Sequence, residues 1–234
     1  MRILVTRPEP DGERTAAKLR ARGCEVMLAP LLRVETVDAD LDGIWHAVAV
    51  TSVNALRAIA DHPALEALLE SPAYAVGGRT ADAALAQGFA NVISADGDVG
   101  DLAGVMKTHL QPGMRVLYLA GEERSGDLTG ALAAAGIEVA TRMVYRTLAL
   151  SAFPPDVREA LVAGWIDGAL HFSRRSAETY LGCAAAAGLT EQALAPVHFC
   201  LSRQVAEPLA AAGAGAIRTA DQPNEAALVG LIAG

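Results

Sequence analysis

The sequence predicts an α/β fold built from two similar parallel-sheet domains. Three observations lead to this prediction. Short apolar runs alternate with amphipathic stretches along the 234 residues, the start of the chain repeats near its middle, and two extended segments flank the central part. Alternation of this kind is typical of parallel strands joined by helices, because each strand needs a long connection back to the same end of its sheet.

The apolar runs are short, and several are apolar on both faces, as strands of a parallel sheet covered by helices must be. In chain order they are Ile3–Thr6, Val26–Leu28, Val48–Ser52, Tyr74–Gly77, Val92–Ser94, Val116–Ala120, Glu138–Ala140, Gly168–Ser173, Val197–Ser202 and Ala216–Thr219. We expect these ten runs to be strands.

Helix-like segments lie between most of these runs. They are Asp11–Arg22, Asn54–Ala60, Thr80–Gln87, Gly126–Ala135, Ser176–Ala187, Val205–Ala212 and Glu225–Ile232. Glycines stand where C-terminal helix caps belong, at Gly23, Gly88, Gly136, Gly188 and Gly213. Glycine is favoured there because it adopts the left-handed backbone conformation without strain.

An internal repeat covers the first strand, helix and strand. Residues 3–33 align without a gap with residues 116–146, at an offset of 113. The residues Leu4, Leu19, Ala21, Gly23, Glu25, Val26 and Arg33 match Leu117, Leu132, Ala134, Gly136, Glu138, Val139 and Arg146. Further along, Ser52 resembles Ser173, and Thr80–Gly88 resembles Val205–Gly213 in spacing. A repeat whose offset is about half the chain length predicts two similar domains.

Two extended segments are positioned to cross between these domains, Leu32–Asp40 and Arg146–Pro155. Two crossings predict that one domain is inserted into the other. We therefore expect a discontinuous domain of residues 1–34 with 150–234 and an inserted domain of residues 35–149. Hinges at paired crossings would let a cleft open and close.

Composition and motifs exclude several classes of protein. The net charge of −8 disfavours a general nucleic-acid binder. No apolar stretch reaches the ~20 residues that span a bilayer, and residues 1–10 lack a signal-peptide pattern. The five histidines and three cysteines show no metal-ligand spacing. We expect a cytoplasmic protein that binds no metal, no nucleic acid and no membrane.

The nucleotide-binding motifs are absent or broken. Gly121–Gly126 has the spacing of a phosphate-binding loop, but Asp127 and Leu128 stand where Lys and Ser or Thr are required. No Gly-x-Gly-x-x-Gly follows a predicted strand, and no Gly-x-Ser-x-Gly elbow occurs. A nucleotide site or a serine-hydrolase site is therefore not expected.

Polar residues instead follow the predicted strands, at the carboxyl ends where open α/β sheets bind ligands. Each group precedes a helix, so free backbone N–H groups point into the same space, and the added arginines favour a carboxylate ligand. The bland alternative for any one group is ordinary helix capping. The predicted substrate-binding residues are Thr6, Arg7, Ser52, Asn54, Gly77, Gly78, Arg79, Thr80, Gly121, Ser173, Arg174, Arg175, Ser176, Ser202, Arg203 and Gln204.

At this point the chain resembles the uroporphyrinogen-III synthase family over its whole length. The segments that carry the resemblance are Ile3–Pro8, Thr51–Ala55, Val76–Ala81, Val116–Glu122, Val144–Thr147 and Phe172–Ala177. Each is weak alone, and their order and spacing together are specific. The resemblance implies two flavodoxin-like domains joined by a two-stranded connector.

The resemblance also implies an activity. The substrate would be hydroxymethylbilane, whose acetate and propionate arms suit the arginines, and the product uroporphyrinogen III, with the last pyrrole inverted and water lost. This chemistry suits an enzyme with no cofactor, and a moving cleft suits a monomer that has at most transient contact with the preceding pathway enzyme. Tyr145 resembles the family's recurrent tyrosine and is the expected catalytic residue, with a packing role at a domain edge as its alternative.

Two further points stay open at the sequence level. The family often has Gly-Pro-Thr-Thr-like residues where this chain has Ser202-Arg203-Gln204-Val205, and whether Ser202 or Gln204 replaces the family's threonine contact is left open by the sequence. The alternative function is that of a non-enzymatic two-domain protein that closes on an anionic small molecule.

Overall fold

The chain forms two compact units. The computed structural model describes residues 1–124 and 126–232, so Ser125 of the glycine-spaced stretch lies outside the described residues. Unit 1 comprises Met1–Arg33 and Leu148–Gly234, and unit 2 comprises Val34–Thr147. The chain therefore passes from one unit to the other twice, and unit 2 is an insertion within unit 1.

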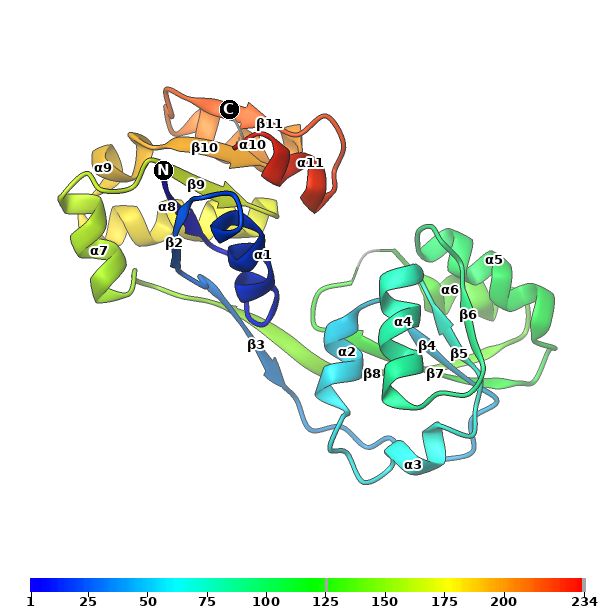
Figure 1. Cartoon of the computed structure of the whole chain (residues 1–234). Helices are drawn as coiled ribbons and strands as arrows, with labels where there is room; N and C mark the ends of the chain where they lie inside the picture. The colour runs from blue at the N-terminus through cyan, green and yellow to red at the C-terminus, as the bar shows by residue number, and fades with distance from the viewer. Residues whose placement is uncertain (125, 233–234) are drawn as a thin grey trace. The chain divides into compact units, whose positions relative to one another are not determined.

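Unit 1 contains a five-stranded sheet in the order β11-β10-β9-β1-β2, in which every neighbouring pair is parallel (Figure 1). Its strands are β1 (Arg2–Val5), β2 (Glu25–Leu28), β9 (Gly168–His171), β10 (Val197–Cys200) and β11 (Ile217–Thr219). The predicted runs lie on these strands, although some of them were expected to run further at the carboxyl end, where the chain already turns into a helix.

The six-stranded sheet, in the order β3-β8-β7-β4-β5-β6, belongs to unit 2 except for the start of β3 and the end of β8. Its strands are β3 (Leu32–Thr36), β4 (Ala47–Val50), β5 (Ala73–Ala75), β6 (Val92–Ser94), β7 (Arg115–Gly121) and β8 (Glu138–Ala149). The five strands from β8 to β6 are parallel. Strands β3 and β8 run antiparallel, because Leu150 N donates to Leu31 O while Val37 N donates to Val144 O.

The two parallel sheets have the same strand order with a permuted chain. The order β2-β1-β9-β10-β11 in unit 1 corresponds to β8-β7-β4-β5-β6 in unit 2. The gapless sequence repeat covers β1 to β2 and β7 to β8, and the later matches relate the ends of β4 and β9 and the helices after β5 and β10. The predicted α/β class with two similar parallel sheets is confirmed.

Helices connect the parallel strands. Those of unit 1 are α1 (Asp11–Arg20), α7 (Pro155–Val162), α8 (Arg174–Ala187), α9 (Thr190–Leu194), α10 (Arg203–Ala211) and α11 (Glu225–Gly230). Those of unit 2 are α2 (Val53–Ala58), α3 (Leu65–Leu68), α4 (Gly78–Gln87), α5 (Val99–His109) and α6 (Leu128–Ala133). The sequence prediction did not name α3, α5, α7 and α9. It also shortened β8 to its first three residues, because the rest of that strand is largely polar.

Alternating burial explains why these short runs become central strands. In β1, Leu4 packs into one cluster while Ile3 and Val5 pack into another, so the sheet of unit 1 has a core on each face. In β7, Leu117 and Leu119 likewise face one cluster and Tyr118 the other. Burial on both faces stabilises each strand by about 1.5–3 kcal/mol for each large side chain, and it fixes the register of the pairs.

Two of the predicted glycine caps end helices in the expected left-handed conformation. Gly88 ends α4 with φ of 110° and Gly188 ends α8 with φ of 67°, both in the left-handed region. The longest helix of the described residues, α8, has 14 residues. Within the described part of the chain, no helix has the length and apolarity needed to cross a membrane.

Candidate functional site

The carboxyl ends of the strands carry the predicted polar residues, in each unit separately. In unit 1, the ends of β1, β9 and β10 are neighbours in the sheet and are followed by residues 6–7, 173–176 and 202–204. In unit 2, the ends of β4, β5 and β7 carry residues 52–54, 77–80 and 121, and β8 brings Tyr145 beside β7. The structure thus gathers the predicted residues along two sheet edges.

Several predicted residues serve the fold at these edges. Thr6 is fully buried, and its hydroxyl donates to the carbonyl of Leu170 on β9 over 2.7 Å. Thr80 and Ser176 are also buried, at 6% and 2% exposure. Thr6 thus ties its loop to the sheet, and all three side chains have little surface to offer a ligand.

Two serines cap the N-termini of the helices that follow them. Ser52 Oγ accepts the N–H of Asn54 at the start of α2, and the Asn54 side chain in turn accepts from Arg57. Ser173 and Ser176 form a reciprocal capping box at the start of α8. Ser52 and Ser173 follow corresponding strands of the two sheets. The capping interpretation therefore applies to both, because a hydroxyl that accepts a helix N–H stabilises that helix.

Two other helices begin without a side-chain cap. Gly77 precedes α4 and Ser202 precedes α10, both in extended conformation and neither giving a side-chain acceptor to the helix. These helices occupy corresponding positions in the two units. Their first N–H groups are left for solvent or for a ligand, and the positive end of the helix dipole favours an anion there.

Arg7 is held by residues of its own unit. Its guanidinium donates to Asp11 over 3.1 Å and to Thr15 over 3.2 Å, and it lies 3.5 Å from the Glu225 carboxylate. It also stacks 4.2 Å from the ring centroid of Phe172, the residue before Ser173. The side chain is only 12% exposed. Arg7 is thus paired with two carboxylates and connects the ends of β1 and β9 to α1 and α11.

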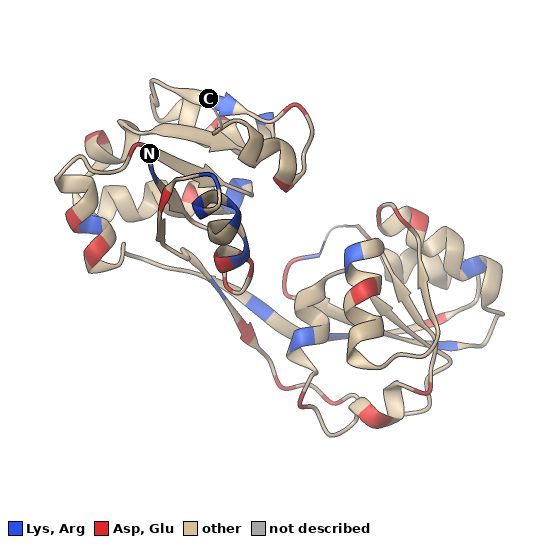
Figure 2. Cartoon of the chain, in the orientation of Figure 1, with Lys and Arg blue, Asp and Glu red and all other residues tan. Residues whose placement is uncertain are grey.

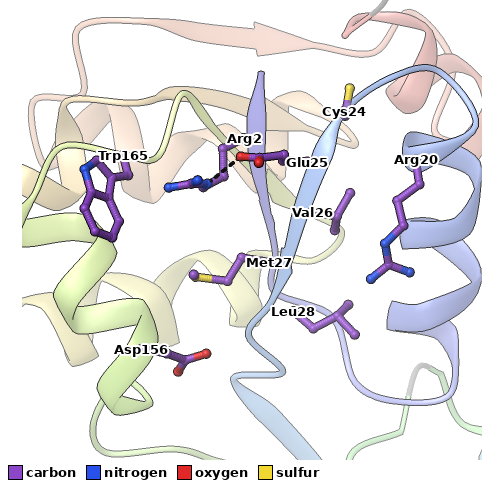
Figure 3. Close-up of a pocket in the computed structure, with 9 residues that line it drawn as sticks. All are labelled: Arg2, Arg20, Cys24, Glu25, Val26, Met27, Leu28, Asp156 and Trp165. Carbon is purple, nitrogen blue, oxygen red and sulfur yellow. Dashed lines mark hydrogen bonds and ion pairs between the residues drawn. The ribbon is translucent and has the colours of Figure 1, made fainter.

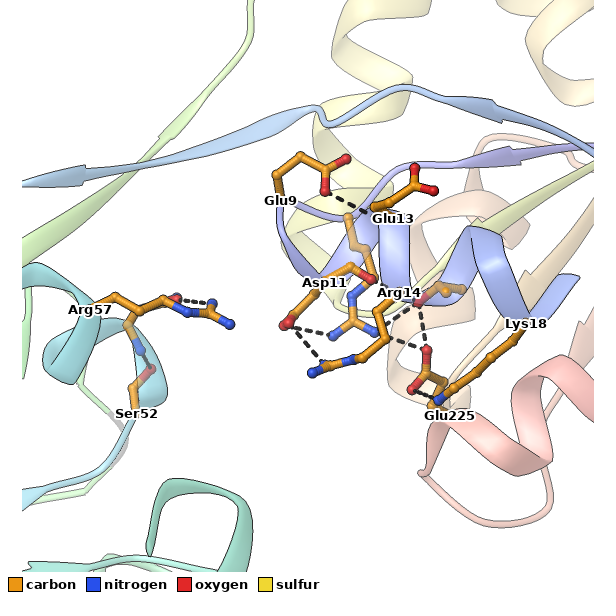
Figure 4. Close-up of polar contacts among 11 residues, drawn as sticks. Glu9, Asp11, Glu13, Arg14, Lys18, Ser52, Arg57 and Glu225 are labelled. Carbon is orange, nitrogen blue, oxygen red and sulfur yellow. Dashed lines mark hydrogen bonds and ion pairs between the residues drawn. The ribbon is translucent and has the colours of Figure 1, made fainter. Parts of the chain in front are cut away.

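Glu225 is the acidic centre of this network. It accepts from Lys18 over 2.6 Å and from Thr15 over 2.6 Å, while Arg14 pairs with Asp11 beside it (Figure 4). Burial raises the pKa of Glu225, but the hydrogen bonds and the charges of Lys18 and Arg7 outweigh it and hold the pKa below its ordinary value. Glu225 lies far along the chain from Arg7, and its sequence neighbours have no pattern that predicts this pairing.

The other arginines at the edge of unit 1 differ in how they are paired. Arg174 is half-exposed and bridges Glu178 and Glu207 at 2.8 Å and 2.6 Å. Arg203, at the open start of α10, is exposed and has no ion pair or hydrogen bond with any residue that the structure describes. Acidic and basic residues are otherwise interspersed in each unit (Figure 2). Arg203 is therefore the arginine of this edge best placed to attract an anion.

Tyr145 lies on β8 at the carboxyl edge of the unit 2 sheet. It is half-buried and packs against the cluster that includes Val144 and Leu119. Its ring covers Gly121, which is buried at the end of β7. The hydroxyl has no hydrogen-bond partner among residues 1–124 and 126–232. A phenol in this position has a free donor, which is what an acid that shares a proton with a leaving group requires.

Two polar pairs were not anticipated from the sequence. At the edge of unit 2, the Thr51 and Tyr118 hydroxyls lie 3.1 Å apart. In the core of unit 1, His171 Nε2 and His198 Nδ1 lie 3.1 Å apart, on neighbouring strands β9 and β10. The alternation of β10 places His198 on the same face as Cys200, which is a weak signal for burial. No spacing in the sequence brings His171 and His198 together.

Burial controls the titration of both histidines. It lowers the pKa of His171 to about 3, with a smaller contribution from the charge of His198. It lowers the pKa of His198 to about 4, against the opposing effect of the nearby Leu194 and Ala193 carbonyls. The second nitrogen of each ring has no partner in the described structure. Both rings are therefore neutral at pH 7, and the pair lies in the core, away from solvent.

A hollow of about 710 Å³ lies along the outer side of the edge strand β2 (Figure 3). Arg2 and Trp165 are part of its lining, and Arg2 is paired with Glu25 over 2.8 Å. None of the predicted site residues lines it. Within the described ranges, no group of three His, Cys, Asp or Glu residues is arranged to hold a metal ion.

Comparison with known families supplies the identity. The model of the family described as uroporphyrinogen-III synthase HemD matches residues 13–230. The chain belongs to the uroporphyrinogen-III synthase family. No curated protein matches the sequence significantly. Among solved structures, uroporphyrinogen-III synthetase from Helicobacter pylori is similar, with 20% identity, coverage of 99% of this chain and 98% of that chain, and a TM-score of 0.67.

A second solved structure has the same fold. It is a mutant uroporphyrinogen III synthase from Thermus thermophilus, with 20% identity, coverage of 99% of this chain and 97% of that chain, and a TM-score of 0.53. In the present chain, the segment Ser202-Arg203-Gln204 follows β10. The Ser202 hydroxyl does not cap α10, so it is available for a ligand.

Proposed function

We propose that this chain cyclises hydroxymethylbilane to uroporphyrinogen III, with inversion of the last pyrrole ring and loss of water. The family match over residues 13–230 carries the proposal. The alternative, a non-enzymatic protein that binds an anionic molecule, is not favoured by this match. We further propose that the chain acts in the cytoplasm as a monomer and meets the preceding pathway enzyme only transiently.

The reaction needs positioning more than it needs a reactive side chain. Loss of the hydroxyl, as water, from the first ring leaves a cation that the pyrrole nitrogen stabilises. The already substituted carbon of the last ring attacks this cation and forms a spiro intermediate. That intermediate fragments and closes again with the last ring inverted, and a proton is lost to restore the pyrrole. The protein's part is to fold the chain and to assist water loss.

The open helix starts are suited to the carboxylate arms of such a substrate. In unit 1, α10 offers uncapped N–H groups, the Ser202 hydroxyl and Arg203, which has no partner among the described residues. In unit 2, α4 offers uncapped N–H groups beside Arg79. Helix N-termini and guanidinium groups both bind carboxylates well. We assign Arg7, which is mostly buried and paired with two acids, to holding the edge rather than to contacting substrate.

Tyr145 is the proposed proton donor to the leaving hydroxyl. Its phenol lies at the carboxyl edge of the unit 2 sheet with no partner among the described residues, as set out above. The developing cation is stabilised by the substrate itself, so the donor has only to share its proton. We also propose that Ser202 or Gln204 makes the contact for which other family members use a threonine.

The decisive experiment is incubation of the purified chain with enzymatically made hydroxymethylbilane, followed by chromatographic separation of the type I and type III isomers. Spontaneous closure yields the type I isomer, so formation of type III above the protein-free control supports the proposal. Substrate binding without any type III product would support the non-enzymatic alternative instead.

Removing several edge arginines together is expected to raise KM. A single exposed charge pair contributes only about 0–1 kcal/mol, so each Ala variant should change KM by less than about fivefold. The triple variant Arg174→Ala/Arg175→Ala/Arg203→Ala should raise KM about tenfold or more, since 1.4 kcal/mol is a factor of ten. The matched control is Arg115→Ala, at the amino end of β7. An unaltered KM in a folded triple variant would contradict the assignment of this edge.

Activity is expected to survive removal of metals and nucleotides. The described residues contain no metal-ligand group, and the glycine-spaced stretch lacks the Lys and Ser or Thr of a phosphate-binding loop. The rate of type III formation should be the same before and after dialysis against a strong chelator. Loss of activity that returns on adding a defined metal ion would show this expectation to be wrong.

A further inference from the structure

The environment of Tyr145 depends on a β-bulge at the end of the β7–β8 pair. Ala120 pairs with Met143 and the next residue, Gly121, pairs with Tyr145, so Val144 is the extra residue. A bulge of this kind turns two consecutive side chains toward one face of a sheet. Val144 and Tyr145 accordingly both pack against the same core cluster. The phenol ring is thereby turned over the end of β7.

Gly121 occupies the position directly beneath that ring. A Cβ built on Gly121 would lie 2.5 Å from Tyr145 Cζ and 2.7 Å from its hydroxyl oxygen. Distances below 3.0 Å are not found for real Cβ atoms. The backbone of Gly121 does not have a positive φ, so alanine can adopt its conformation. What excludes a side chain here is the space that the Tyr145 ring takes.

The backbone around this contact is held on both sides. Glu122 N donates to Tyr145 O over 3.0 Å, and Val37 N, just after β3, donates to Val144 O over 2.8 Å. The clash caused by a side chain at Gly121 would therefore be relieved by rotation of the Tyr145 ring about its two side-chain bonds, and not by movement of the strands. The expected consequence is a displaced hydroxyl in an otherwise intact sheet.

We propose that Gly121 is a positioning residue for the reaction: its missing side chain lets the Tyr145 ring lie against the end of β7 and so determines where the hydroxyl is presented. This inference rests on the proposed function and on the proposed role of Tyr145. It also assigns Gly121 a place beneath the catalytic ring, instead of the contact with substrate that the sequence predicts.

The test is a double-substitution cycle with Gly121→Ala and Tyr145→Phe. Misplacing a reacting group by about 1 Å can cost about 10²-fold in rate, so Gly121→Ala should lower kcat at least about tenfold and change KM by less than about twofold. In the Tyr145→Phe background, Gly121→Ala should lower kcat no further. A loss of equal size in both backgrounds would overturn the proposal, because the glycine would then act independently of the hydroxyl.

The matched control is Gly104→Ala in α5, where an added Cβ meets no atom within 4 Å. This variant should keep wild-type kcat. A readout independent of activity uses 3-fluorotyrosine and ¹⁹F NMR, with the Tyr145 signal identified by its loss in Tyr145→Phe. That signal should shift in Gly121→Ala and stay in Gly104→Ala. An unshifted signal in a wild-type chain that forms type III product would refute the positioning role alone. A wild-type chain without type III product would refute the proposed function and, with it, any positioning role in that reaction.

Discussion

Replacing Tyr145 by Phe is expected to lower kcat by about 10²-fold or more while type III remains the main product. The substitution keeps the ring over Gly121 and removes only the hydroxyl. General acid catalysis typically contributes about 10²–10⁴-fold, and water replaces a lost donor only in part. Product type should persist because the folding of the substrate depends on the edges as a whole. Single-turnover assays with isomer separation measure both quantities.

The matched control for this variant is Tyr74→Phe. Tyr74 is 2% exposed in β5 and packs on the opposite face of the same sheet from Tyr145. This control should leave kcat unchanged. An unchanged kcat in Tyr145→Phe would remove the residue from the mechanism. A switch to type I product at normal consumption would show that the hydroxyl controls geometry and that the acid role is wrong.

The stability of unit 1 is expected to fall as the pH drops from about 6.5 to about 5, because of His171 and His198. Burial depresses the pKa of these rings to about 3 and about 4 in the folded chain, below the ordinary value of 6.5. Below pH 6.5 the unfolded chain binds protons that the folded chain cannot, so acid favours unfolding. The stabilisation is fully present above pH 6.5 and is lost as the pH falls toward the folded pKa values.

The expected size of this effect is large. Each proton changes the free energy of unfolding by about 1.4 kcal/mol per pH unit, so the two rings together give a loss of about 4 kcal/mol between pH 8 and pH 5. Domains of this size are stable by only about 5–15 kcal/mol. Urea unfolding at pH 8, 6.5 and 5 measures the loss directly, and the window stays above the range in which most carboxylates titrate.

The variant that isolates the histidine pair is His171→Gln/His198→Gln, which keeps polar side chains and removes the titration. Its free energy of unfolding should be nearly constant from pH 8 to pH 5. His46→Gln, at an exposed position, is the control and should retain the wild-type pH dependence. A wild-type curve that is flat over this range, or a double variant with an undiminished slope, would assign the acid sensitivity to other groups.

Local patterns made most of the strands and the repeat predictable. A run such as Val48–Val50 is buried on both faces wherever it lies, so apolar character alone indicates a central strand. The gapless match of residues 3–33 with 116–146 indicated a duplicated strand-helix-strand unit, which the structure shows as β1-α1-β2 and β7-α6-β8. The same pattern failed for β8, whose polar second half continues as a strand because β3 pairs with it.

The candidate site was likewise predictable only in part. Polar residues at strand ends were readable from the sequence, and parallel strands place such ends at one edge. What each residue does there depends on partners that the local sequence does not contain. Arg7 meets Glu225, and Gly121 meets Tyr145. The open start of α10 differs from the capped start of α8 although a serine precedes both.

The sequence by itself thus determined the α/β class, the duplicated unit and the set of strand-end residues, since these follow from burial and turn preferences within a few neighbouring residues. Only the tertiary structure decided which arginines are already neutralised, which helix starts are open, that two histidines share the core, and that a bulge lays Tyr145 over Gly121. Those features are contacts between residues far apart in the chain, and their energies depend on distances that only the folded chain sets.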